Sequence, residues 1–142
     1  TSAISTDALN HEKMVETRQA KIDKIADIIP ELEVVGDKDD AELLIVGWGG
    51  TYGHLYEAME VLQSEGKKVA LAHFRFINPL PKNTGEVLKK YRKVVVAEQN
   101  SGQFANYLRS KITNFTPYKV NRITGQPFEV SNLVEEFKKL IG

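Results

Sequence analysis

Two patterns of hydrophobic and polar positions alternate along the chain. Short apolar runs, typical of strands buried on both faces of a sheet, occur at 43–46, 69–76 and 94–97. Apolar residues at helical spacing follow at 52–65, 83–91 and 103–113, and again from Ser131, which we expect to cap the last helix. Strands that alternate with helices predict a three-layer α/β fold with a mostly parallel sheet and helices on both faces.

The N-terminal region has a different character. We expect residues 1–9 to form a loose tail, and a helix to run from Asn10 to about Ile29, where Pro30 ends it. Its apolar stripe (Val15, Ile22, Ile25 and Ile29) is narrow, so the helix either packs on its own domain or rests on another domain upstream. We therefore divide the chain into a tail and linker helix (1–30) and one α/β domain (31–142).

The edges of the sheet are less distinct in the sequence. Residues 32–35 predict a short edge strand, and residues 118–123 alternate like a strand near an edge. A polar turn at 36–40 separates the first of these from the first buried strand.

Composition narrows the classes of function. The chain has 142 residues, 42% of them hydrophobic, which suits one compact domain. Its 19 basic and 19 acidic residues cancel, so we expect no nucleic-acid partner. Without cysteine, this chain can hold no disulfide, thiolate metal site or cysteine-ligated iron–sulfur cluster. Because no apolar run approaches the roughly 20 residues of a membrane helix, we expect no membrane partner and a cytoplasmic location.

A glycine-rich loop follows the first buried strand and opens a helix. Its backbone N–H groups could bind an anion there, and the candidate residues are Gly47, Gly49, Gly50, Thr51 and Gly53. The spacing departs from the dinucleotide fingerprint, and the region that should supply an acidic residue holds His73 and Arg75. We therefore favour a tight structural turn over a binding loop.

Several other side chains are candidates for an interface or for chemistry. Trp48 and Tyr52, beside the glycines, favour an interface anchor, and Arg75 and Asn78 favour a contact across a domain or subunit boundary. Glu98 ends a buried strand and could act as a base, bind backbone N–H groups of the next turn, or join that interface.

The histidines predict no metal or catalytic site. His11, His54 and His73 lie far apart in sequence and match no ligand pattern. Because no nucleophile, base and orienting group can be assigned, we predict no catalytic and no metal-binding residue in this chain.

Four ordered blocks resemble a known family, the α subunits of 2-oxoacid:ferredoxin oxidoreductases, and in particular the 2-oxoglutarate type. The four blocks lie at 44–53, 75–83, 95–103 and 125–128. A segment at 10–15, with Arg18, also resembles the linker between the two domains of those subunits. Together these segments cover nearly the whole chain. The resemblance implies a fold like the transketolase C-terminal domain, with five strands and one antiparallel edge strand.

The resemblance also implies a parent enzyme. That enzyme decarboxylates a 2-oxoacid on thiamine diphosphate and magnesium, passes the acyl group to coenzyme A, and sends electrons through iron–sulfur clusters to ferredoxin. Those cofactors would belong to an upstream thiamine-binding domain and to other subunits, and this domain would serve assembly and packing. Two other hypotheses remain: a free-standing nucleotide- or anion-binding module using Gly47–Gly53, and a small enzyme using His54 or Glu98.

Overall fold

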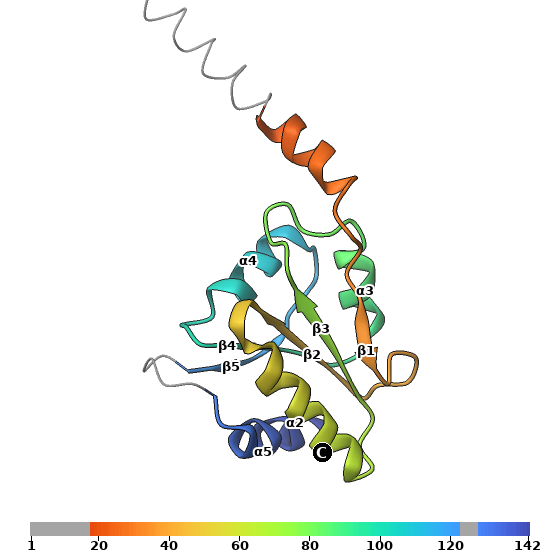
Figure 1. Cartoon of the computed structure of the whole chain (residues 1–142), viewed down its shortest axis with the longest axis vertical. Helices are drawn as coiled ribbons and strands as arrows, with labels where there is room; N and C mark the ends of the chain where they lie inside the picture. Colours follow the sequence, from red (N-terminus) through yellow and green to blue (C-terminus); the bar gives the residue numbers. More distant parts are fainter. Residues whose placement is uncertain (1–17, 123–127) are drawn as a thin grey trace, which may run out of the picture.

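The computed structural model describes residues 18–122 and 128–142 of the chain (Figure 1). Its strands are β1 (Val34–Gly36), β2 (Leu43–Trp48), β3 (Val69–Phe74), β4 (Val94–Glu98) and β5 (Tyr118–Asn121). Its labelled helices are α2 (Tyr52–Ser64), α3 (Thr84–Lys90), α4 (Gln103–Lys111) and α5 (Val130–Ile141), with a short 3-10 turn, η1, at Gly49–Thr51. Strands and helices alternate as the apolar pattern predicts.

The five strands form one mixed sheet with the order β1-β3-β2-β4-β5. The central strand β2 pairs in parallel with both neighbours, so that Ile45 lies opposite Leu71 on one side and Val95 on the other. β4 and β5 are also parallel, whereas β1 runs antiparallel to β3. The predicted fold class, a mostly parallel five-stranded sheet with one antiparallel edge strand, is confirmed.

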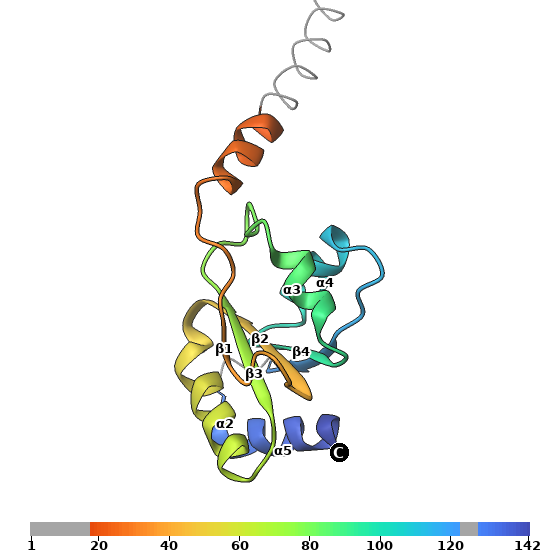
Figure 2. The ribbon, with the colours of Figure 1, turned by 90° about the vertical axis from the view of Figure 1, so that its right-hand side faces the viewer.

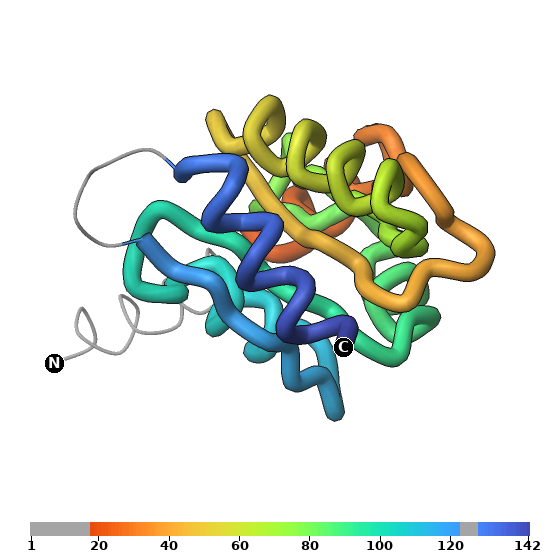
Figure 3. The backbone as a smooth tube through the Cα atoms, turned by 90° about the horizontal axis from the view of Figure 1, so that it is seen from below, coloured from red at the N-terminus to blue at the C-terminus, as the bar shows by residue number. Residues whose placement is uncertain are grey.

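Helices cover both faces of the sheet because successive strand residues point to opposite sides. Leu44 and Val46 face the core beneath α3 and α4, which includes Phe104 and Leu108. On the other face, Leu43 and Ile45 belong to the core that α2 and α5 contribute to. Figure 2 shows the two layers on either side of the strands, and Figure 3 shows α2 and α5 side by side.

The N-terminal helix extends away from this body (Figures 1 and 2). Its described part spans residues 18–26, followed by a turn that leads to Pro30. The side chains of Ile25 and Ile28 are 43% and 80% exposed, and Asp27 forms a surface ion pair with Lys82. The proposed start at Asn10, with Val15 of the stripe, lies outside the described residues.

Some predicted boundaries were wrong. α5 begins at Val130, because the Leu133 N–H donates to the Glu129 carbonyl, so Ser131 lies inside the helix and does not cap it. The first edge strand starts later than predicted, since Leu32 and Glu33 do not pair as a strand. Among the described residues, no helix has the length and apolar character needed to cross a membrane.

Candidate functional site

Two loops meet where the chain reverses its winding at the centre of the sheet. From β2 the chain passes to β3 on one side, whereas β4 lies on the other side of β2 and leads to β5. The carboxyl ends of β2 and β4 therefore stand side by side, and their loops (49–51 and 99–102) border the crevice where α/β sheets commonly bind ligands.

The glycines of the first loop are required for two different reasons. A Cβ on Gly47 would lie 2.2 Å from Leu55 Cδ1, so this residue lets α2 pack closely on β2. Gly49 has φ +68°, a left-handed conformation that favours glycine. Gly50 and Gly53 face open space, and the Thr51 hydroxyl donates to the Trp48 carbonyl (3.1 Å). Packing and local geometry thus account for much of the loop.

The second loop closes on the start of α4. Glu98 is 1% exposed, and its carboxylate accepts hydrogen bonds from the backbone N–H groups of Phe104 (2.6 Å) and Ala105 (3.0 Å). The Asn100 side chain accepts two more, from Gly102 and Gln103. Four N–H groups at the start of α4 thus find their acceptors within the chain itself. Glu98 caps this helix from inside the domain, and its carboxylate is not exposed at the surface.

Trp48 joins the two loops. Its ring lies 5.7 Å from that of Phe104 in α4, and its side chain is half-buried against the α3 and α4 core. The hydroxyl groups of Thr51, Ser64, Thr84 and Ser110 donate to backbone carbonyls. None of these four hydroxyls is therefore held against a base as an activated nucleophile would be.

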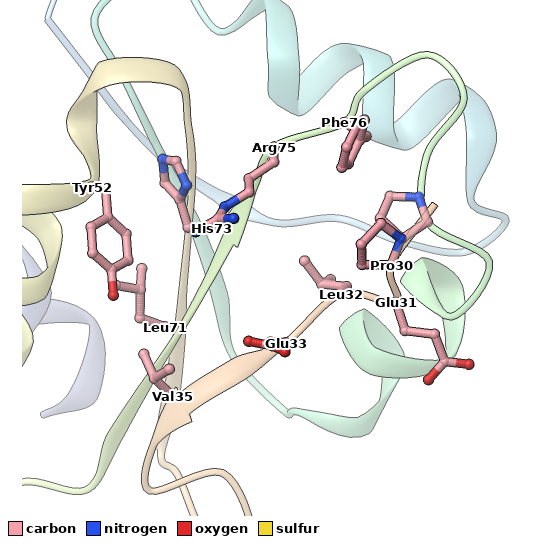
Figure 4. Close-up of a pocket in the computed structure, with 11 residues that line it drawn as sticks. Pro30, Glu31, Leu32, Glu33, Val35, Tyr52, Leu71, His73, Arg75 and Phe76 are labelled. Carbon is pink, nitrogen blue, oxygen red and sulfur yellow. The ribbon is translucent and has the colours of Figure 1, made fainter. Parts of the chain in front are cut away.

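A separate groove lies beside this crevice, along the edge strand β1 (Figure 4). It has a volume of about 580 Å³ and is lined by residues of β1 and the segment before it, of β3 and the loop after it, and of the start of α2. Those named in Figure 4 are Pro30, Glu31, Leu32, Glu33, Val35, Tyr52, Leu71, His73, Arg75 and Phe76. Tyr52 and Arg75, two predicted interface residues, thus share one concave surface.

His73 is the least expected member of the groove. Burial lowers the pKa of its imidazole, a hydrogen bond with the Gly49 backbone raises it, and the nearby Arg75 charge lowers it further. The imidazole is therefore neutral at pH 7. Its Nε2 atom is buried and has no hydrogen-bond partner among the described residues. The Tyr52 ring meets the imidazole edge-on, with the centroids 5.1 Å apart.

The remaining candidates lie apart from one another. Asn78 is exposed in the loop after β3, and His54 is half-buried on α2. His11 falls outside the described residues. Within 18–122 and 128–142, no three potential metal ligands come together. The sequence did not predict the groove, because its residues come together only through the antiparallel pairing of β1 with β3. No local motif indicates that pairing.

Known proteins share this architecture. The model of the family "Transketolase, C-terminal domain" matches residues 32–141. The chain belongs to this family. A transketolase assembled from split genes has the same fold, with a TM-score of 0.56 and 17% identity over 77% of this chain and 41% of its own.

Within the family, this transketolase C-terminal domain is similar to one group of enzyme subunits. It is 52% identical over 76% of its length to the 2-oxoglutarate oxidoreductase subunit KorA of Mycobacterium tuberculosis, and 34% identical over 93% to a 2-oxoacid:ferredoxin oxidoreductase α subunit of Aeropyrum pernix. The structure of the 2-oxoglutarate:ferredoxin oxidoreductase from Magnetococcus marinus, with 2-oxoglutarate, coenzyme A and succinyl-CoA bound, superimposes with a TM-score of 0.85 at 30% identity. The resemblance seen in the sequence blocks is confirmed.

The match covers only a part of these larger proteins. The domain spans 16% of the Mycobacterium subunit, 22% of the Aeropyrum subunit and 24% of the Magnetococcus chain, while 94% of the domain itself is covered in the last comparison. The relatives are thus much longer subunits, and this chain corresponds to one domain of them.

Proposed function

We propose that the chain is the C-terminal assembly domain of the α subunit of a 2-oxoacid:ferredoxin oxidoreductase of the 2-oxoglutarate type. The observation that carries the proposal is the 52% identity to a 2-oxoglutarate oxidoreductase subunit of which the domain spans only 16%. Such a share suits one domain of a larger catalytic assembly better than a complete enzyme.

The chemistry of the crevice supports a non-catalytic role. Glu98, the carboxylate at the end of β4, is committed to two backbone N–H groups of α4, and Asn100 to two more. The second loop therefore offers neither a free base nor a free helix start to a ligand. Thr51 in the first loop is likewise engaged with a backbone carbonyl.

The names of the relatives support a proposal for the reaction of the parent enzyme. We propose that the complete enzyme decarboxylates 2-oxoglutarate on thiamine diphosphate with magnesium, makes an acyl-CoA, and passes electrons through iron–sulfur clusters to ferredoxin in the cytoplasm. Those cofactors would be held by the upstream thiamine-binding domain and by other subunits. Their binding residues are not expected in this domain, whose sequence holds no cysteine for a cluster.

The exposed candidates favour a contact surface on the domain. Tyr52 is 43% exposed, and Arg75 and Asn78 lie on the loop after β3. Tyrosine and arginine are enriched at the centres of protein interfaces. We propose that these residues, next to Trp48 at the crevice, face the neighbouring domain or subunit.

Reconstitution tests this proposal directly. The full-length α subunit and the same subunit lacking residues 31–142 would each be expressed with the partner subunits, and complex formation followed by size-exclusion chromatography. We expect the deletion to abolish assembly and coenzyme A-dependent ferredoxin reduction with 2-oxoglutarate. An intact, fully active complex without the domain would contradict the proposal.

Titration of the chain by itself separates this function from a binding module. Thiamine diphosphate with magnesium, coenzyme A and NADP would be added in turn and followed by calorimetry, and we expect no heat of binding. A signal lost on Gly49→Val would favour the alternative of a nucleotide- or anion-binding module at Gly47–Gly53. One observation keeps that alternative open: no side chain caps α2 at Thr51.

A further inference from the structure

The N-terminal helix joins the domain through a short connection. Its hydrogen-bonded turns continue as far as Ile29, whose N–H donates to the Ile25 carbonyl (3.2 Å). Leu32, three residues later, is already buried in the core beneath α3 and α4. Only Pro30 and Glu31 lie between the last turn and this buried residue. Because proline fixes its own φ at about −65° and restricts the residue before it, the connection has little freedom to bend.

The Asn83 side chain holds the inner end of the connection. It accepts a hydrogen bond from the Leu32 N–H (2.7 Å), and its amide donates to the Leu32 carbonyl (2.9 Å). A side-chain amide offers the same donor and acceptor as a peptide group. Asn83 therefore pairs with Leu32 as a neighbouring strand would, at a place where β1 has not yet begun.

A second contact holds the outer end of the connection. Asp27, in the turn after the helix, forms an ion pair with Lys82, the residue next to Asn83. One contact would fix only a point on the connection, whereas two contacts several residues apart also fix its direction. Both charged side chains are more than half exposed, and exposed ion pairs contribute little. The larger contribution therefore comes from Asn83.

The residues that make these two contacts are themselves held by hydrogen bonds. Thr84 is buried, and its hydroxyl donates to the Pro81 carbonyl (2.6 Å). The Thr84 N–H donates to the same carbonyl (3.1 Å), and the Val87 N–H donates to the Asn83 carbonyl (2.9 Å). Lys82 and Asn83 thus lie in a closed turn that continues directly into α3.

We propose that Lys82 and Asn83 form a clamp that fixes the direction in which the N-terminal helix leaves the domain. The helix is mostly exposed and extends away from the body (Figures 1 and 2), so these contacts, and not packing of the helix, determine its direction. The inference rests on the proposed function, in which a thiamine-binding domain lies upstream. The clamp sets the orientation of this domain relative to that one.

Distances between spin labels measure the direction of the helix. The chain has no cysteine, so labels attach only where cysteine is introduced. Lys21→Cys on the N-terminal helix and Glu60→Cys on α2, both at exposed positions, form the helix pair. We expect double electron–electron resonance on the whole chain to give one narrow distance distribution for this pair.

Three further substitutions identify the group responsible. Asn83→Ala removes both hydrogen bonds to Leu32, so we expect the narrow distribution to be lost in favour of a broad one. Lys82→Ala breaks only the exposed ion pair and should broaden the distribution less. Asn106→Ala is the matched control, because this exposed asparagine on α4 contacts Lys119, and it should leave the distribution narrow.

A second pair of labels separates loss of the clamp from loss of the fold. Glu60→Cys with Arg109→Cys on α4 reports on the body of the domain, and its distribution should stay narrow in Asn83→Ala. If Asn83→Ala does not fold, Asn83→Asp takes its place. An ionised aspartate still accepts from the Leu32 N–H but cannot donate to the Leu32 carbonyl, so we expect intermediate broadening of the helix pair.

The outcomes separate this inference from the proposed function. A broad distribution for the helix pair in the otherwise unaltered chain would overturn the clamp, and so would a narrow one that persists when Asn83 is replaced. Equal broadening in Lys82→Ala or in Asn106→Ala would refute the leading part of Asn83. An assembly that depends on residues 31–142 would stand after any of these results. Assembly without those residues would contradict the proposed function and leave the distance distributions as they are.

Discussion

Glu98 shows how burial decides the role of a carboxylate. Its position at the end of a central strand is where α/β enzymes often place a catalytic group. Here both carboxylate oxygens accept backbone N–H groups of α4, at 2.6 and 3.0 Å. Hydrogen bonds to an ionised acceptor at a helix start are among the stronger ones in proteins. The side chain therefore stabilises the fold at the place where it could have been reactive.

This role predicts the effect of Glu98→Gln. Glutamine keeps one acceptor oxygen but turns an NH₂ group toward a backbone N–H, so we expect a loss of about 1–3 kcal/mol in the free energy of unfolding. Urea denaturation followed by circular dichroism measures it. Glu60→Gln, at an exposed position of α2, is the control and should change stability little. Equal effects of the two substitutions would show that the cap contributes nothing.

His73 makes stability depend on pH near neutrality. Its folded-state pKa lies below the ordinary value of 6.5, mainly through burial, so the unfolded chain binds the proton more readily. The stability that neutral His73 provides is complete above pH 6.5 and is lost as the pH falls through the folded pKa. We expect urea midpoints to decline from pH 7.5 to 5.5, and to decline less in His73→Leu.

The groups around His73 determine which control the pH experiment needs. Arg75 and Glu33 line the same groove, and the Gly49 backbone opposes the lowering of the His73 pKa that burial and the Arg75 charge cause. His54→Leu is the matched control, and we expect it to keep the decline. A profile as steep in His73→Leu as in the unaltered chain would show that other groups cause it.

The roles of Glu98 and His73 differ in how far the neighbouring sequence predicts them. That Glu98 could bind the N–H groups of the following turn was one of the alternatives, because strand end, turn and helix start are contiguous. The groove at His73 could not be predicted, because Tyr52, Glu33 and His73 meet only through strand pairing and helix placement. Local patterns carry no information about such contacts.

At the scale of elements, two connections set the shape of the site. Gly47 lets α2 approach β2, and Asn83 fixes the segment before β1 on α3 through two hydrogen bonds to Leu32. The first produces a tightly packed crevice at the centre of the sheet. The second keeps the edge of the sheet open. The crevice is therefore filled by side chains, whereas the neighbouring groove is open.

Alanine substitutions at two glycines of the first loop should change the free energy of unfolding in opposite directions. In Gly47→Ala the new Cβ would lie 2.2 Å from Cδ1 of the fully buried Leu55, so we expect destabilisation by about 1–3 kcal/mol. Gly53 lies within α2 and its Cβ would meet nothing within 4 Å, so Gly53→Ala should stabilise by about 0.5–1 kcal/mol. Thermal unfolding compares the two. A neutral Gly47→Ala would mean that Leu55 moves without cost.

The apolar runs predicted the elements better than their ends. β4 and, apart from the half-buried Trp48, β2 are buried strands flanked by strands on both sides, and such strands appear in sequence as apolar runs. The edge strand β1 is only three residues long, and its start depends on where Asn83 holds the chain. The cap at Ser131 failed because the backbone ladder already begins at Glu129.

At the scale of the whole molecule, the sheet carries a separate core on each face. One includes α3 and α4, the other α2 and α5, and the Lys138–Glu65 ion pair (2.6 Å) links the two helices of the second. This organisation is complete without the N-terminal helix, whose described residues are mostly exposed. The body of the molecule should therefore be an independent folding unit from about residue 31.

A truncation series tests that division. Removing residues 1–30 deletes the surface ion pair of Asp27 with Lys82, which at such exposure is worth about 0–1 kcal/mol, so the urea midpoint should hardly change. Removing residues 1–36 also deletes β1 and the buried Leu32, and should cost more than about 2 kcal/mol. If the shorter truncation were as damaging as the longer, the N-terminal helix would have to pack on the domain. If the helix adds nothing to this domain, its exposed Ile25 and the exposed Ile28 in the turn after it are available to contact another domain.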